Sequence, residues 1–207
     1  MPQALLFPAI RWESVGPLLL VALAIMGSPG PATISLVAAG TVYGIRRSLK
    51  YVAGIVIGTT IVLVAVAGGI TAALLAVPAI GSVLIGISAA YILWLAYRIA
   101  TAPPLSEQTK PVEAPSLAGG AVLGVANPKA WVGIGAVFTS ANLAGDAATD
   151  AAAKVAVLTA MIALIMPAWL VAGSSLAPLL REPRRARVVN AALALVLVGA
   201  TALTIIR

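Results

Sequence analysis

The chain has 207 residues, of which 61% are hydrophobic and 9% are charged. A soluble domain usually carries about 25% charged residues, so this composition excludes a soluble globular protein and predicts an all-α protein embedded in a lipid bilayer. The chain has neither Cys nor His, which excludes disulfides, Cys/His metal sites and the commonest general base. We therefore expect no enzymatic activity and no cofactor.

The formal net charge is +7. Such a basic balance is typical of nucleic-acid-binding domains when the charges gather on one surface. Here Lys and Arg are scattered in short segments between apolar runs, as the positive-inside rule requires of cytoplasmic loops. The charge pattern therefore predicts a membrane topology and no nucleic-acid partner.

A helix needs about 20 apolar residues to cross a bilayer core. Six segments meet this requirement, with Pro78 and Gly81 as the expected turn between the second and third. A model of five spans and one re-entrant segment is the alternative. A cleaved signal peptide is less consistent with the sequence, because the apolar run continues past Ala24. The expected spans are 16–42, 51–76, 80–98, 117–142, 155–177 and 188–206.

The spans divide a single membrane domain, 1–207, into two three-helix repeats, 16–100 and 117–206, separated by a polar, proline-rich loop at 101–116. Because each repeat has three spans, the two repeats are expected to have inverted topologies. The loops on one side carry nine basic residues, against three on the other, so we expect both termini outside the cytoplasm of a bacterial inner membrane. The nine residues are Arg46, Arg47, Lys50, Arg98, Lys110, Arg181, Arg184, Arg185 and Arg187.

The first span of each repeat contains a helix-breaking motif near its middle. These motifs are Gly27-Ser28-Pro29-Gly30-Pro31 and Asn127-Pro128-Lys129. Proline removes a backbone donor and clashes with the preceding turn, and the freed backbone groups then need other partners inside a membrane. Paired breaks at corresponding positions of two repeats indicate a transporter binding site.

Each break also creates a new helix N-terminus. Pro31 suits the first turn of a half-helix, and Asn127 can cap a half-helix that begins at Pro128. Lys129 is the only charge in the interior of an expected span, away from its ends, so we expect it to face an aqueous cavity or a partner rather than lipid. A purely structural role, with Lys129 bonded to carbonyls at the kink, is the alternative. The candidate substrate-binding residues are Ser28, Pro29, Gly30, Pro31, Asn127, Pro128 and Lys129.

The chain resembles the LysE/RhtB family of amino-acid exporters. The resemblance rests on GSPGPA in the first span, the glycines at 44, 54 and 58, AAYILWLAYRI at the end of the third span and ANPKAW in the fourth. It implies export of amino acids or related metabolites from the cytoplasm, usually linked to the proton motive force. Some relatives carry an acidic residue in the fifth span, whereas this chain has MIALIMPAWLVAG there, which places proton coupling through such a carboxylate in doubt.

The absence of a carboxylate within the expected spans also bears on the substrate. Lys129 and two positive helix ends attract a carboxylate and repel a cationic side chain. We therefore expect a neutral amino acid or small carboxylate to be exported by alternating access. The alternatives are a small-ion (anion or metal) exporter and a structural membrane subunit that transports nothing. GxxxG spacings such as Gly54/Gly58 and Gly120/Gly124 suit either close helix packing or a homodimer face.

Overall fold

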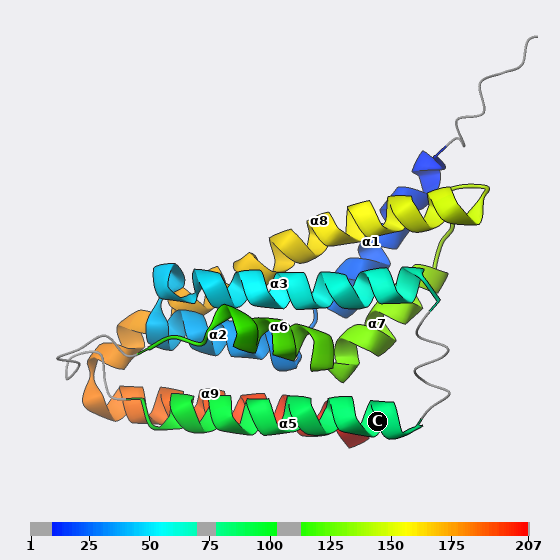
Figure 1. Ribbon diagram of the computed structural model, residues 1–207. Helices are drawn as coiled ribbons and strands as arrows, with labels where there is room; N and C mark the ends of the chain where they lie inside the picture. The colour runs from blue at the N-terminus through cyan, green and yellow to red at the C-terminus, as the bar shows by residue number, and fades with distance from the viewer. Residues whose placement is uncertain (1–9, 70–77, 103–112, 207) are drawn as a thin grey trace, which may run out of the picture.

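The computed structural model describes residues 10–69, 78–102 and 113–206, and this part of the chain is helical without strands (Figure 1). Most of the expected loop at 101–116, including Lys110, lies outside the described residues. The helices are α1 (Trp12–Met26), α2 (Pro31–Tyr43), α3 (Ile45–Ala67), α5 (Pro78–Ala100), α6 (Leu117–Ala126), α7 (Pro128–Thr139), α8 (Ala147–Ser174) and α9 (Pro183–Ile206), with a short 3-10 helix, η2 (Ala177–Arg181), before α9.

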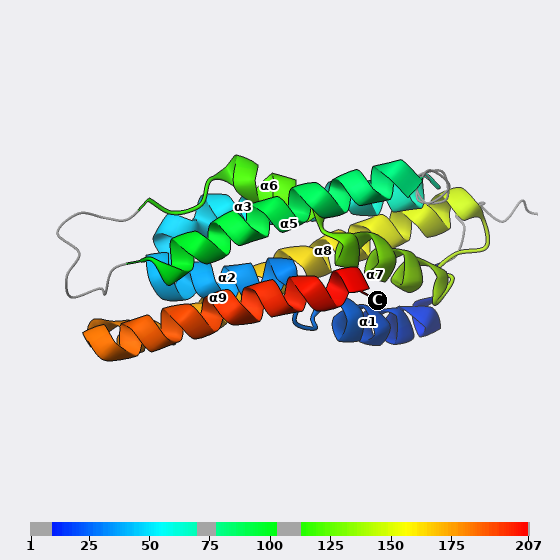
Figure 2. The same cartoon turned by 90° about the horizontal axis from the view of Figure 1, so that it is seen from below.

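The helices run roughly along one long axis and form an elongated bundle (Figures 1 and 2). α3 packs along α6, α2 packs along α8, and α5 packs along α9. The core contains aliphatic side chains from both halves of the chain, including Leu36, Ile55, Leu123 and Leu158, each with no exposed surface. The two halves of the sequence therefore both contribute side chains to one hydrophobic core.

The outer surface of the bundle is also apolar. Leu20, Leu164 and Leu195 are 70%, 73% and 73% exposed, which water would disfavour and lipid would accept. By length and composition, two helical segments among the described residues, Ile45–Ala67 and Ala147–Leu179, can cross a membrane. The count rises to four if each bent helix pair forms one span. The fold is thus that of a multi-pass integral membrane protein.

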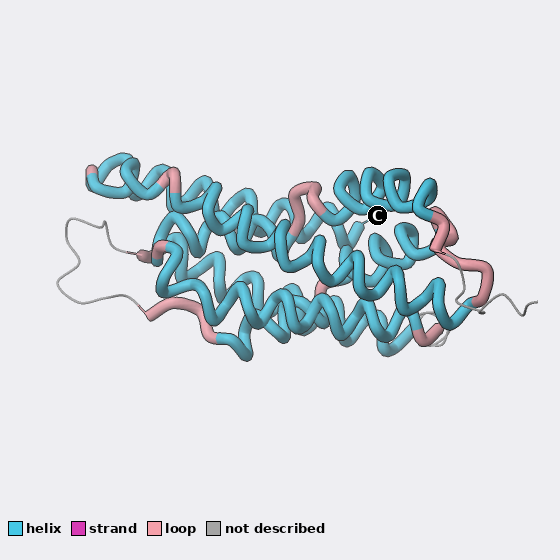
Figure 3. Tube along the Cα trace, turned by 90° about the horizontal axis from the view of Figure 1, so that it is seen from above, coloured by secondary structure: helices cyan, strands magenta, loops and turns pink. Residues whose placement is uncertain are grey.

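Both predicted helix breaks are present. α1 and α2 meet at an angle of 67°, and α6 and α7 meet at 58°. Both breaks lie near the middle of the long axis of the bundle (Figures 1 and 3). Each broken pair is followed by two unbroken helices, α3 and α5 or α8 and α9. The broken pairs run in opposite directions along the axis (Figure 1).

The structure corrects several expected helix boundaries. α5 begins at Pro78, so Pro78 and Gly81 lie in its first turn rather than in the turn before it. Proline is favoured at that first position because its missing N–H would have no partner there. α8 begins at Ala147, capped by the Asp146 side chain, eight residues before the expected start. Asp150 and Lys154, which lie between the expected spans 117–142 and 155–177, are therefore helical.

Glycines bring α3 and α6 into direct backbone contact. A β-carbon added at Gly54 would lie close to the carbonyl oxygen of Leu117, and one added at Gly58 would lie close to that of Ala121. Gly120 and Gly124 make the reciprocal approach to the backbone of α3. Of the two uses expected for these GxxxG spacings, the structure shows close packing within the chain, which places α3 beside the break between α6 and α7.

Candidate functional site

The first break is stabilised by its own polar groups. The Thr33 hydroxyl accepts a hydrogen bond from the Gly30 backbone N–H (2.8 Å) and donates to the Gly30 carbonyl (3.1 Å). The Ser28 hydroxyl donates to the Ile25 carbonyl at 2.8 Å. Pro31 is the first residue of α2, as expected of a proline that cannot donate a backbone hydrogen bond.

The second break is built around Asn127. Its side-chain oxygen accepts a hydrogen bond from the Lys129 backbone N–H at 3.2 Å, which caps α7, and Pro128 is the first helical residue. The Trp131 indole N–H donates to the Val125 carbonyl at 2.7 Å. That carbonyl faces the break, where the helix supplies no backbone donor, so Trp131 satisfies a group that would otherwise be costly inside a membrane.

Lys129 joins the two breaks. Its Nζ donates to the Ser28 carbonyl at 2.6 Å, to the Ser28 hydroxyl at 2.8 Å and to the Pro29 carbonyl at 3.0 Å. These three bonds use all three protons of an ammonium group. The carbonyls freed by the first break thus hold the charge introduced at the second break, across 101 residues of sequence.

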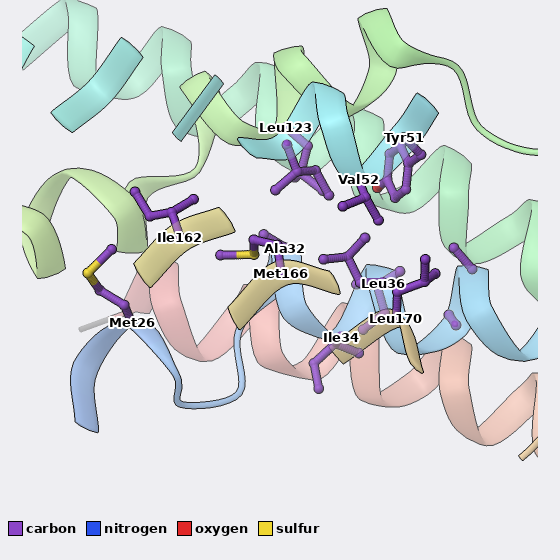
Figure 4. Close-up of a cluster of buried hydrophobic side chains, with 14 of the residues drawn as sticks. Met26, Ala32, Ile34, Leu36, Tyr51, Val52, Leu123, Ile162, Met166 and Leu170 are labelled. Carbon is purple, nitrogen blue, oxygen red and sulfur yellow. The ribbon is translucent and has the colours of Figure 1, made fainter. Parts of the chain in front are cut away.

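A small cavity lies beside this bridge, with a volume of about 40 Å³. One water molecule needs about 10–15 Å³ of cavity volume, so the cavity has room for a few waters but not for an amino acid. Figure 4 shows part of the surrounding core, with Met166 of α8 beside Ala32 of α2 and Met26 at the end of α1. The lining residues are Ile25, Met26, Gly30, Ala32, Thr33, Thr59, Asn127, Lys129, Ala130, Gly133, Ile134 and Met166.

The seven residues expected to form the site fall into three groups. Gly30, Asn127 and Lys129 line the cavity. Ser28 and Pro29 contact the Lys129 ammonium group instead. Pro31 and Pro128 lie outside the lining and begin the half-helices. The structure therefore brings all seven to the two breaks, but only three of them to the cavity wall.

Several lining residues were not anticipated from the sequence. Thr59 of α3 and Met166 of α8 reach the cavity from helices without a break. Neither belongs to a motif, since a threonine or methionine inside an apolar helix is common. The GxxxG spacing of Gly54 and Gly58 is the sequence feature that could have directed attention to α3, because such a spacing predicts close contact with another helix.

The lining contains one charged side chain, Lys129, and no carboxylate. In the part of the chain that the structure describes, no three acidic side chains come together as metal ligands. The cavity lining thus combines one cation with an amide, hydroxyl groups and thioethers, and the Ser28 and Pro29 carbonyls bind that cation from outside the lining. This chemistry suits a small anionic or zwitterionic molecule better than a metal cation.

Known membrane transport proteins are similar to this chain. The family model described as LysE type translocator matches residues 23–206. A cysteine/O-acetylserine efflux protein of Salmonella paratyphi A is 39% identical over 84 residues, which cover 41% of this chain and 43% of that protein. Its namesake in Escherichia coli O1:K1 is 38% identical over 87 residues, covering 41% and 45%. The matches thus span less than half the length of these curated relatives. No solved structure matches the chain.

Proposed function

The chain belongs to the family of LysE type translocators, and from this premise we propose that it exports a small neutral amino acid, or a related carboxylate, from the cytoplasm. As a member of that family it is a transporter in the membrane and not an enzyme. The efflux proteins that resemble it are named for cysteine and O-acetylserine. These two neutral amino acids are therefore the first substrates to test.

The single observation that carries the proposal is the bridge between Lys129 and the first break. A substrate carboxylate replaces the Ser28 and Pro29 carbonyls as the partner of the Lys129 ammonium group. The bonds from the ammonium group to the carbonyls are already charge-assisted, and a carboxylate adds the attraction between two opposite charges. The released carbonyls then accept hydrogen bonds from the substrate's amino group, so one exchange binds both ends of a zwitterion.

The size of the cavity supports a mechanism with moving parts. Because about 40 Å³ is too small for an amino acid, binding requires the Lys129 side chain to move away from the link between α1 and α2. The two halves of the chain, as two inverted three-helix repeats, rock around the breaks and open the site to one side of the membrane at a time.

The absence of acidic side chains from the lining favours a neutral substrate. A lysine or arginine substrate would bring a second positive charge close to Lys129 without a carboxylate to balance it. We therefore infer selection against cationic amino acids. Robust export of lysine without export of any neutral amino acid contradicts this part of the proposal.

The topology that we propose has six spans and both termini outside the cytoplasm. The start of α3, the end of α5 and the start of α9 lie at one end of the bundle (Figure 1), and these segments contain exposed arginines such as Arg46 and Arg185. The positive-inside rule assigns that end to the cytoplasm. Labelling of single cysteines introduced at either end, with a membrane-impermeant reagent on intact cells, tests this orientation.

Transport in reconstituted vesicles tests the function. Purified wild type should exchange labelled L-cysteine or O-acetyl-L-serine across the vesicle membrane. Lys129→Met should abolish that exchange while remaining folded, as judged by its circular dichroism and elution in detergent. Lys50→Met is the matched control, because Lys50 is exposed and should be dispensable. Normal transport by Lys129→Met refutes the role given to that residue. Transport of chloride or a metal ion, with no amino-acid transport by wild type, refutes the amino-acid function.

A further inference from the structure

Thr59 lies in α3, at the wall of the cavity that also contains Lys129. Its side chain is 4% exposed, and its hydroxyl group has no hydrogen-bond partner among the residues that the structure describes. A buried hydroxyl without a partner destabilises a fold, so a hydroxyl group left in this state beside a proposed binding site requires an explanation.

Three other helical threonines satisfy their hydroxyl groups within their own helices. The Thr41, Thr139 and Thr201 hydroxyls donate to the carbonyl four residues earlier in their own helices, at 2.7, 3.2 and 2.8 Å. This local bond is the usual solution for threonine in a helix. The Thr33 hydroxyl, which also lines the cavity, is occupied by Gly30. Thr59 is thus the described cavity threonine whose hydroxyl is available to a ligand.

The position of Thr59 is rigid. A β-carbon added at Gly124 of α6 would lie 2.8 Å from the Thr59 backbone nitrogen, so the two backbones are in direct contact at this level. Gly124 lies three residues before Asn127, where α6 ends. Packing therefore holds the Thr59 hydroxyl at a constant place relative to the second break, as a specificity-determining group requires.

The neighbours of Thr59 indicate which part of a substrate it contacts. Met26, Ile134 and Met166 give this cavity mainly apolar walls, where a charged ammonium group with one hydroxyl partner would be poorly solvated. A neutral hydroxyl, thiol or ester needs only one or two hydrogen bonds. The Thr59 hydroxyl can donate to such a group or accept from it.

We propose that Thr59 determines substrate specificity by hydrogen-bonding a short polar side chain of the exported amino acid. This inference rests on the proposed function, in which Lys129 and the first break hold the carboxylate and amino groups. Thr59 then distinguishes L-serine from L-alanine, and L-cysteine from L-2-aminobutyrate, which carries a methyl group in place of the thiol. A site that hydrogen-bonds a polar substrate group discriminates against the analogue that lacks it.

Equilibrium binding to the purified full-length protein in detergent tests the inference, with these four amino acids as probes. Wild type should bind serine more tightly than alanine, and cysteine more tightly than 2-aminobutyrate, by up to about tenfold, as one ordinary hydrogen bond provides. Thr59→Val replaces the hydroxyl with a methyl group of similar shape. It should reduce both ratios to about one and leave alanine affinity close to that of wild type.

Two matched variants serve as controls. Thr59→Ser retains the hydroxyl and should preserve both ratios. Thr60→Val removes another buried, unpartnered hydroxyl one residue along α3 that is not part of the lining, and it should also preserve them. If Thr59→Val does not fold, Thr59→Ala removes the same hydroxyl without putting a methyl group in its place and should show the same loss of discrimination.

The outcomes separate this inference from the proposed function. If wild type binds none of the four amino acids, the proposed function fails and takes the role of Thr59 with it. If wild type binds them but Thr59→Val retains both ratios, only the inference about Thr59 is overturned. An equal loss of affinity for all four probes also overturns it, because that result assigns Thr59 to the carboxylate, to the amino group or to packing.

Discussion

The side chain of Lys129 passes directly over Gly30: a β-carbon added at position 30 would lie 2.6 Å from Lys129 Cδ and 3.0 Å from its Nζ. The backbone of Gly30 is extended, with φ of −171°, so alanine can adopt it without strain. The close approach, and not the conformation, is what requires glycine at this position.

Gly30→Ala is therefore expected to change the transport kinetics without unfolding the protein. The flexible lysine chain can yield to the added methyl group at a cost of about 1 kcal/mol if it leaves its preferred rotamer. That cost falls on the substrate-free bridge, which the proposed binding step breaks, so apparent substrate affinity should rise roughly fivefold. Transport by vesicles over a range of substrate concentrations measures this gain. Gly135→Ala on α7, where an added β-carbon meets nothing within 4 Å, should transport normally. Wild-type kinetics in Gly30→Ala contradict the proposed position of the ammonium group.

Gly54→Ala should destabilise the contact between α3 and α6. The new β-carbon would collide with the backbone of Leu117 and lie 2.9 Å from the Ala121 nitrogen, and backbone atoms cannot move aside as a side-chain terminus can. Overpacking of this kind costs about 1–3 kcal/mol. Unfolding of the purified protein in mixed micelles gives the free energy directly. Gly199→Ala on α9 has open space around it and should match wild type; equal stability of the two variants refutes this account of the helix contact.

The ion pair of Lys154 and Asp150 predicts a second, independent stability effect. Lys154 is 2% exposed, lies 2.7 Å from the Asp150 carboxylate and donates to the Phe138 carbonyl at 2.7 Å. Lys154→Met leaves Asp150 without its cation. Breaking a fully buried pair in this way costs about 3–5 kcal/mol, and because the Asp150 side chain is 14% exposed we expect a loss near the lower end of that range. The double variant Asp150→Asn/Lys154→Met removes both charges and should be more stable than Lys154→Met alone. If the double variant is the less stable of the two, the charge of Asp150 is not the source of the loss.

The Asp146 carboxyl group makes the free energy of unfolding depend on pH in the acid range. The Thr149 backbone N–H donates to its side chain at 2.9 Å, and this bond is the main cause of the lowered pKa of the Asp146 carboxyl group. A lowered pKa in the folded state adds stability above the unfolded pKa of about 4, and that stability is lost as the pH falls through the folded value. Asp146→Asn retains a capping oxygen but does not titrate. Its melting temperature should therefore fall less than that of wild type between about pH 5 and pH 2, and parallel curves would contradict this role.

Local sequence chemistry determined where the helices break. Pro29, Pro31 and Pro128 cannot donate backbone hydrogen bonds, and Asn127 caps the half-helix that follows it, so both breaks were predictable without knowledge of the rest of the fold. The apolar composition likewise determined that the protein belongs in a membrane. These properties depend only on each residue and its near neighbours in the chain, so they can be inferred from the sequence alone.

Tertiary packing decided which distant groups meet at those breaks. No local pattern predicts that Thr59 rather than Thr60 reaches the cavity, or that the Lys129 ammonium group bonds the Ser28 and Pro29 carbonyls. Lys154 lies one residue before the expected span 155–177, yet α8 extends past it, and its buried ammonium group donates to the Phe138 carbonyl of α7. Such contacts depend on helix rotation and on close glycine approaches between α3 and α6. They arise only when segments far apart in the chain bury their surfaces together.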